Sequence, residues 1–264
     1  MPLIPLGGTF YFRNTQITLT DTCNIDCTLQ IIFYLFRYTD KGRKFFQEKT
    51  DDLGNTVKRI FSLMEQNKVQ LARLTWIRIV LRIKGNDLNL RGAERKQGVG
   101  GLSPWLRYLL KTLKCSQEDC PSQERDPTVT SAVDEHPTNP EQFMSWFGTG
   151  KDSNCSVCHS KAVEIFKFNG DPQALIAYTL DSRWETNKGV KVYAPETKLQ
   201  KIQIIGGVQY TVVAYTIYTG SHFYAVIWDK NCRYTYDSQD SPLQIVPRKD
   251  ITSYPVHTVW LLRD

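Results

Sequence analysis

Apolar side chains recur at steps of three and four residues through the first part of the chain. Within residues 23–38 they are Ile25, Leu29, Ile32, Phe33 and Phe36, which share one face of a helix. Residues 55–83 continue this spacing and are expected to be mostly helical. A further helix is predicted over residues 106–113, because leucines at 106, 109, 110 and 113 follow a serine and a proline that suit a helix start.

The second part of the chain is rich in Val, Ile, Tyr and Trp, which favour strands. Strands are predicted over residues 208–218, 222–228, 233–236 and 258–262, with a tight turn at 229–232. Between the two parts, residues 114 to about 142 carry prolines, acids and hydroxyls, which predict a loop or insertion. We therefore expect one α+β domain with a helical part at 1–113, a polar insertion at 114–145 and a β-rich part at 146–264.

Composition limits the class of protein. The chain has 264 residues, 41% of them hydrophobic, which is enough for a substantial core. No apolar run approaches the roughly 20 residues of a membrane helix, and the start lacks the basic region of a signal peptide. The net charge of +6 comes without a dense Lys/Arg run. We expect an intracellular protein of the cytoplasm or nucleus, with neither nucleic acid nor membrane as partner.

The chain has seven cysteines, an odd number that argues against a disulfide framework and favours a nucleophile plus metal ligands. The pairs Cys115/Cys120 and Cys155/Cys158 have spacings close to those of tetrahedral zinc ligands. A four-cysteine shell leaves no open coordination position, so such a zinc ion would be structural and not catalytic. The alternative is a set of free cysteines that binds no metal.

Three residues together have the chemistry of a cysteine nucleophile. Cys23 stands at a predicted helix start, where free N–H groups and the helix dipole favour a thiolate. His222 begins a predicted strand, and Asp237 follows the next strand. A hairpin of that length can bring the carboxylate beside the imidazole, as a catalytic base requires. Cys27, one turn after Cys23, is interpreted as a core cysteine.

These residues resemble the ubiquitin-specific proteases, a branch of the papain-like cysteine proteases. Residues 21–30, Asp-Thr-Cys-Asn-Ile-Asp-Cys-Thr-Leu-Gln, are similar to the family's Cys box, and residues 220–225 with 233–238 are similar to its His box. Weaker similarities cover residues 104–113, 147–168 and 256–262 in the family's order. The resemblance implies a thumb–palm–fingers fold, with Cys23 as nucleophile, His222 as base and Asp237 orienting the base. It also implies hydrolysis of the bond after the C-terminal diglycine of ubiquitin.

Two departures from the family pattern leave alternatives open. Thr18 stands where the family has an oxyanion-donating asparagine, so Thr18, Gln16 or helix-start N–H groups are the candidate donors. The acidic stretch that faces the arginines of the ubiquitin tail is missing before residue 104. The form Cys23-x-x-Asp26-Cys27 also resembles the SUMO-directed member of the superfamily. The alternatives are therefore an isopeptidase for SUMO or another ubiquitin-like protein, and a non-catalytic ubiquitin-binding module.

Overall fold

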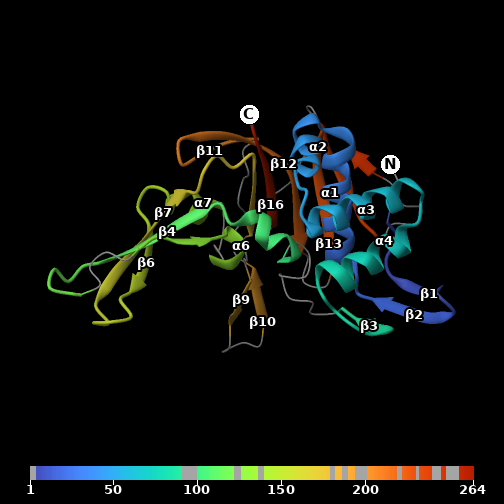
Figure 1. The fold of residues 1–264 in the computed structure, drawn as a ribbon, viewed down its shortest axis with the longest axis horizontal. Coiled ribbons are helices and arrows are strands. Elements are labelled where there is room, and N and C mark those ends of the chain that lie inside the picture. Colours follow the sequence, from blue (N-terminus) through green and yellow to red (C-terminus); the bar gives the residue numbers. More distant parts are fainter. Residues whose placement is uncertain are drawn as a thin grey trace.

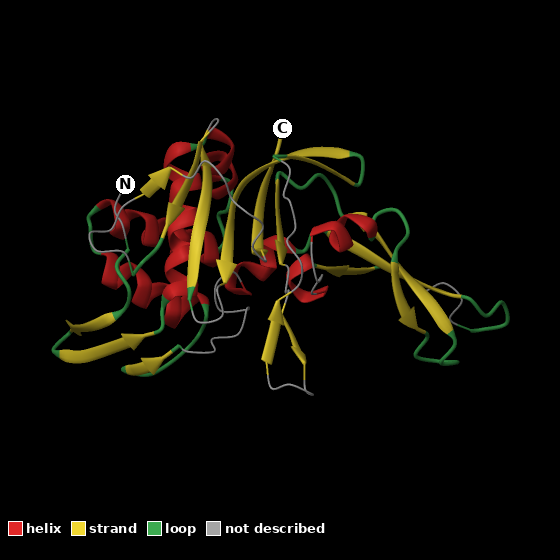
Figure 2. Ribbon diagram, turned by 180° about the vertical axis from the view of Figure 1, so that it is seen from behind, coloured by secondary structure: helices red, strands yellow, loops and turns green. Residues whose placement is uncertain are grey.

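The structure is a computed structural model that describes residues 4–90, 100–121, 126–135, 140–178, 182–185, 190–193, 201–218, 222–229, 232–239, 245–247 and 256–264. Figure 1 shows helices packed against a central antiparallel sheet, and a second sheet that extends away from them. Figure 2 shows the same arrangement from behind. This is an α+β architecture of the expected class, with most helices in the first half of the chain.

The helices of the first half match the sequence pattern closely. They are α1 (Cys23–Tyr38), α2 (Asp40–Gln47), α3 (Asp52–Glu65) and α4 (Val69–Thr75), which continues into a π-helical turn, Trp76–Val80. The helix predicted over 23–38 is confirmed. The mostly helical stretch predicted over 55–83 is confirmed with one break, where Asn67 adopts a φ of 57° between α3 and α4.

The central sheet contains the strands of the second half. Its strands are β8 (Ala174–Tyr178), β11 (Ile202–Ile205), β12 (Val208–Tyr218), β13 (Phe223–Asp229), β14 (Cys232–Tyr236), β15 (Ile245–Pro247) and β16 (Val256–Arg263). They pair in the order β15-β14-β13-β12-β16-β8, and β11 pairs with the first half of β12. The four strands predicted from composition are confirmed to within two residues. Helix α1 packs against β13 and β12, so the start of one half meets the end of the other.

A small sheet, which includes the hairpin that precedes α1, was not foreseen from the sequence. It consists of β1 (Gly8–Phe12), β2 (Thr15–Thr20) and β3 (Asp87–Asn89). Arg13 and Asn14, with φ of 49° and 61°, form the two-residue turn of the β1–β2 hairpin, because positive φ at both positions matches the twist of the strands. β2 leads almost directly into α1, so this hairpin fixes the approach to Cys23.

The second sheet is called the distal sheet here. It has the order β5-β4-β7-β6, formed by β4 (Leu109–Cys115), β5 (Thr128–Thr130), β6 (Lys151–Asn154) and β7 (Lys161–Phe168). A separate hairpin joins β9 (Ser182–Glu185) to β10 (Val190–Tyr193). Residues 169–173 connect β7 of the distal sheet to β8 of the central sheet.

The helix predicted over residues 106–113 is wrong. A 3-10 helix, Gly100–Leu106, ends there, and the leucines that follow belong to β4. Residues four apart share a face in a strand as well as in a helix, so Leu109 and Leu113 fit both patterns. Pairing of β4 with β7, far along the chain, decides the outcome.

The stretch expected to be a loop also carries structure in its described residues: β5, α6 (Ala132–Glu135) and α7 (Pro140–Ser145). Glu135 pairs with Lys111 at 2.6 Å and with Lys151 at 3.2 Å. The polar residues of this stretch resemble a loop in sequence because the residues they pair with, such as Lys111 and Lys151, lie on strands outside it. The domain boundaries at 113 and 145 remain predictions.

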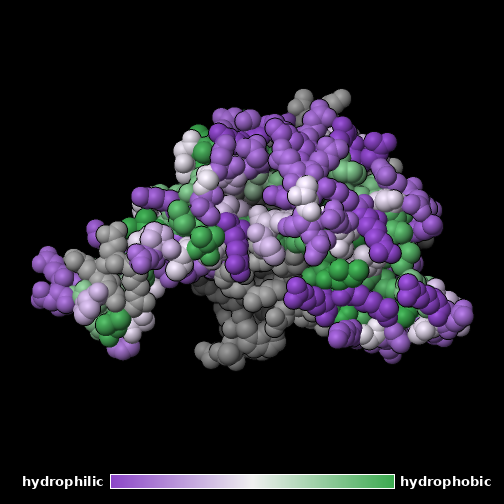
Figure 3. All heavy atoms as spheres, viewed as in Figure 1, coloured by the Kyte–Doolittle hydropathy of each residue, from purple (hydrophilic) through white to green (hydrophobic). Residues whose placement is uncertain are grey.

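Buried apolar side chains form two separate groups. The main core joins α1–α4 to the central sheet and includes the fully buried Phe33, Phe61, Trp76, Trp146 and Trp260. The second group, called the distal cluster, contains Cys115, Cys120, Cys155 and Ala162, with Leu113 and Cys158 at its edge. Over α2 and α3 the outer surface is mainly hydrophilic (Figure 3). None of the described helices combines the length and the apolar character needed to span a bilayer.

Candidate active site

Cys23 is the first residue of α1 and is only 8% exposed. Asp21 precedes the helix with a φ of 54°, and Thr22 occupies the N-cap position. The Thr22 side chain does not cap a backbone N–H of α1 but donates to Asp26 Oδ2 at 2.5 Å. Burial raises the pKa of the Cys23 thiol, although backbone N–H groups of Phe223 and Asn24 lower it in part. The thiol of the free protein is therefore mostly protonated at neutral pH.

His222 and Asp237 lie side by side at the end of one hairpin. His222 directly precedes β13 and Asp237 directly follows β14, and the two strands pair with Ala225 opposite Tyr236. His222 Nε2 lies 2.6 Å from Asp237 Oδ1, which also accepts the Gln239 N–H at 2.9 Å. A carboxylate only accepts, so Nε2 carries the proton and a neutral ring has its lone pair at Nδ1. That nitrogen is the one able to take a proton from a thiol.

Packing of α1 on β13 brings the thiol and the imidazole into one neighbourhood. The N–H of Phe223, the residue after His222, forms a hydrogen bond to the Cys23 thiol. His222 also interacts electrostatically with Asp26, one helical turn beyond Cys23. The structure thus brings together all three residues that the sequence singled out for nucleophilic chemistry.

The candidate oxyanion donors lie on β2, the central strand of the small sheet. Thr18 and Gln16 are on its more exposed face, opposite the buried Ile17 and Leu19. The Thr18 hydroxyl lies 3.2 Å from the Thr9 hydroxyl, and Gln16 pairs across the hairpin with Tyr11. No hydrogen bond found among the described residues joins either side chain to Cys23. Their role as oxyanion donors remains a prediction.

A buried ion pair next to the site was missed by the sequence reasoning. Arg73 Nε donates to Asp26 Oδ1 at 2.6 Å, and both side chains are fully buried. Burial raises the pKa of Asp26 to about 6, against the opposing effects of Arg73 and Thr22. A signal was available: Val69, Arg73, Trp76 and Val80 follow helical spacing and are all buried. A charged residue in the middle of an apolar face indicates a buried partner.

The four paired cysteines meet in the distal cluster. The Sγ atoms of Cys115, Cys120, Cys155 and Cys158 all lie within 4.8 Å of one another. Cys115 Sγ is 3.5 Å from Cys158 Sγ, and Cys120 Sγ is 3.7 Å from Cys155 Sγ. Zinc–sulfur bonds of about 2.3 Å place tetrahedral sulfurs roughly 3.8 Å apart, so these spacings fit a structural zinc ion. The N–H of Ser160 lowers the pKa of Cys158 to about 6, which favours the thiolate that zinc requires.

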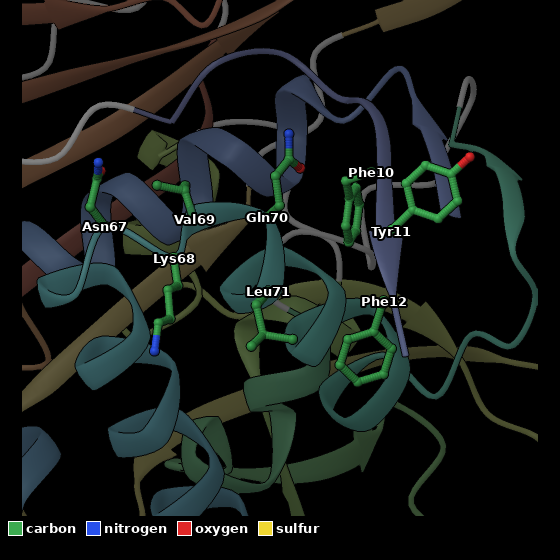
Figure 4. A pocket seen from close by; sticks show the side chains of 8 residues that line it. All are labelled: Phe10, Tyr11, Phe12, Asn67, Lys68, Val69, Gln70 and Leu71. Atoms are coloured by element: carbon green, nitrogen blue, oxygen red, sulfur yellow. The ribbon is translucent and has the colours of Figure 1, made fainter. Parts of the chain in front are cut away.

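A hollow of about 280 Å³ lies between β1 and the start of α4 and contains none of the predicted site residues. Figure 4 shows Phe10, Phe12 and Leu71 around it, with Tyr11 turned outward. One lining residue, Gln70, also accepts a hydrogen bond from Arg73 Nη1. A hydrogen bond thus links the lining of the hollow to the buried ion pair beside the candidate site.

Comparison with known proteins identifies the fold but not a sequence family. No family model matches the chain, and no curated protein matches it. Solved structures of the SAGA DUB module, formed by Ubp8, Sgf11, Sus1 and Sgf73, are similar. The module bound to monoubiquitin matches with a TM-score of 0.56 at 8% identity, over 92% of this chain and 67% of that chain.

Two further structures of the module agree with this match. One has a TM-score of 0.55 at 7% identity and covers 100% of this chain and 69% of that chain. The module bound to ubiquitin aldehyde has a TM-score of 0.51 at 10% identity, over 92% of this chain and 68% of that chain. The chain therefore shares its α+β fold with these DUB-module structures. At such low identity the likeness concerns the fold alone.

Proposed function

We propose that this chain is a thiol-dependent deubiquitinase that cleaves the isopeptide or peptide bond after the C-terminal diglycine of ubiquitin. The observation that carries the proposal is the 2.6 Å contact between His222 and Asp237, in a hairpin whose Phe223 N–H reaches the Cys23 thiol. The similarity to modules that hold monoubiquitin and ubiquitin aldehyde supports the choice of substrate.

The proposed reaction follows from the protonation states of these groups. His222 Nδ1 takes the proton of the Cys23 thiol, and the thiolate attacks the carbonyl carbon of the terminal glycine. Asp237 holds Nε2 and stabilises the imidazolium. The imidazolium then protonates the leaving lysine amine, and a water molecule, deprotonated by His222, releases ubiquitin and regenerates the thiol. N–H groups at the start of α1, with Thr18 and Gln16 as further candidates, are the proposed donors to the oxyanion.

Each of two alternative functions is favoured by an observation of its own. The residues Cys23-x-x-Asp26-Cys27 resemble a SUMO-directed enzyme, although here the Asp26 carboxylate is fully engaged by Arg73 and Thr22. The raised pKa of the Cys23 thiol favours a module that binds ubiquitin without cleaving it. Substrate binding must shift the equilibrium toward the thiolate if the enzyme proposal is correct.

Covalent probes separate these alternatives. Ubiquitin and SUMO, each with a C-terminal propargylamide, are incubated with wild type, Cys23→Ala and Cys27→Ala, and adducts are measured by intact mass. Cys27 is the matched control, because it is a fully buried thiol one turn further along α1. We expect an adduct with ubiquitin that Cys23→Ala abolishes and Cys27→Ala retains. An adduct with SUMO alone moves the assignment to SUMO, and a folded protein without any adduct contradicts the enzyme proposal.

A further inference from the structure

The first described residues, 4–7, form an extended segment between the two parts of the candidate site. This segment, called the N-terminal strap, runs from Ile4, which is fully buried, to Gly7. A Cβ on Gly7 would lie 2.2 Å from the Leu19 carbonyl oxygen, so only glycine permits the chain to pass this close to the end of β2. The strap is therefore a packed element of the fold.

One side of the strap holds the turn that carries Asp237. The Leu6 N–H donates to the carbonyl oxygen of Ser238, the next residue, at 3.0 Å. The Tyr236 hydroxyl, from the residue before Asp237, donates to the Ile4 carbonyl oxygen. Both neighbours of Asp237 are thus hydrogen-bonded to the strap, Ser238 through its backbone carbonyl and Tyr236 through its side-chain hydroxyl.

The other side of the strap holds the start of α1. The Gly7 N–H donates to Thr22 Oγ1 at 2.9 Å, directly before Cys23. The Pro5 carbonyl oxygen accepts from Arg73 Nη2. Since Thr22 and Arg73 also share the Asp26 carboxylate, the strap and the ion pair form one hydrogen-bonded network.

Arg73 is the centre of this network. Its three guanidinium nitrogens donate to three different elements: Nε to Asp26 in α1, Nη1 to Gln70 in α4 and Nη2 to Pro5 in the strap. The planar fork of an arginine fixes directions as well as distances, which a lysine ammonium does not. A buried ion pair often adds little to stability relative to apolar residues, and one attested use is to specify a geometry.

We infer that Arg73 is a positioning residue that, through Asp26 and the N-terminal strap, sets the start of α1 and hence Cys23 against the His222–Asp237 pair. The inference rests on the proposed function for its catalytic meaning. It assigns to Arg73 a role without any contact to the substrate. A displacement of about 1 Å between reacting groups can cost a factor of about 10² in rate.

The test uses variants that remain able to fold. Asp26→Leu with Arg73→Met removes both charges and leaves no buried ion without a partner. Arg73→Lys keeps the charge but loses the fork. Lys111→Met is the matched control, because it breaks a 2.6 Å ion pair between Lys111 of the distal sheet and Glu135 of α6. Thermal unfolding of each variant verifies that it is folded.

Two readouts separate positioning from general stability. Cleavage of a ubiquitin–lysine isopeptide substrate is expected to show kcat lowered about 10²-fold in the double variant and about 10-fold in Arg73→Lys, with KM nearly unchanged. Lys111→Met should retain the wild-type kcat. Folded variants whose kcat stays within about twofold of wild type would overturn the inference.

The second readout needs no ubiquitin and so remains informative if the proposed function fails. Alkylation of Cys23 by iodoacetamide is followed by peptide mass spectrometry, with and without His222→Ala, in the wild-type and the double-variant background. In wild type, His222→Ala is expected to change the rate about 10-fold or more, and in the double variant less than about twofold. Equal effects in the two backgrounds, or no effect in wild type, contradict positioning by Arg73.

Discussion

The main core and the distal cluster stabilise their surroundings in different ways. The main core packs large aromatic and aliphatic side chains between helices and the central sheet. The distal cluster has almost no apolar mass, since its buried members are three cysteines and Ala162. A group this small cannot offset the conformational entropy of the strands around it. The comparison indicates that the cysteine-bearing end of the distal sheet needs a cross-link such as a bound zinc ion, whereas the main core, which also takes in Leu109 of β4 and Phe166 of β7, is stabilised by burial.

Polar groups show the same contrast. Around Cys23, single hydrogen bonds connect the N-terminal strap to α1 on one side and to the residues beside Asp237 on the other. In the distal sheet, Lys111, Lys151, Glu135 and Glu164 form a partly exposed network of ion pairs. Exposed pairs contribute little to stability individually, while a buried pair is costly to break. The first network therefore fixes a geometry, and the second gives the distal sheet only modest support.

The largest expected effect concerns metal removal. Chelation, or Cys155→Ser, should leave the cysteine-bearing end of the distal sheet without a core, whereas Phe166 of β7 stays in the main core. Amide exchange in β6 and in the first residues of β7 is therefore expected to accelerate by about two orders of magnitude or more. Amides of α1 and β12 should change little. Native mass spectrometry and hydrogen exchange measure zinc content and local protection. Cys27→Ala is the control, and a wild-type protein that carries no zinc yet protects the distal sheet would refute this expectation.

A smaller loss of stability is expected when the buried pair of the main core is broken on one side. Arg73→Met leaves the Asp26 carboxylate buried without its cation and should lower the free energy of unfolding by about 3–5 kcal/mol. Asp26→Leu combined with Arg73→Met should restore most of the lost free energy of unfolding. Urea unfolding followed by tryptophan fluorescence measures both variants. If the double variant is as unstable as the single one, the pair contributes net stability and the comparison above is weakened.

The pH dependence of stability provides a finer test of the same pair. The folded pKa of Asp26 is raised from 3.8 to about 6 by burial. Its contribution to stability is therefore present below about pH 4 and is lost as the pH rises through 6. Relative to the double variant, wild type should lose roughly 2 kcal/mol between pH 4 and pH 7. Urea unfolding at both pH values measures the difference, and a gain in relative stability with rising pH would mean that Arg73 outweighs burial.

Local pattern and composition were sufficient to predict α1 and four strands of the central sheet, β12, β13, β14 and β16. The hairpin of β13 and β14 also followed from sequence, since its short turn brings His222 to Asp237. Such features depend on residues that are near neighbours in the chain. The four-cysteine cluster was foreseen because cysteine spacing itself indicates metal-ligand chemistry.

Features that depend on distant partners were not predictable in this way. The leucines of β4 fit helix and strand equally, and only pairing with β7 decides between them. The role of Arg73 depends on Asp26 and on the strap, neither of which is near it in sequence. The proposed role of Thr18 and Gln16 as oxyanion donors likewise depends on where β2 lies in the fold, which the sequence motif around Cys23 does not specify. Sequence reasoning located the chemical groups but not the scaffold that orients them.

The position of the β13–β14 hairpin near one end of the chain has a consequence for biosynthesis. Cys23 leaves the ribosome early, and His222 and Asp237 leave it late, as translation proceeds from the N-terminus. During most of translation the thiol therefore has no imidazole partner. The nascent polypeptide can gain thiol–imidazole chemistry only after the β13–β14 hairpin has emerged and docked on α1.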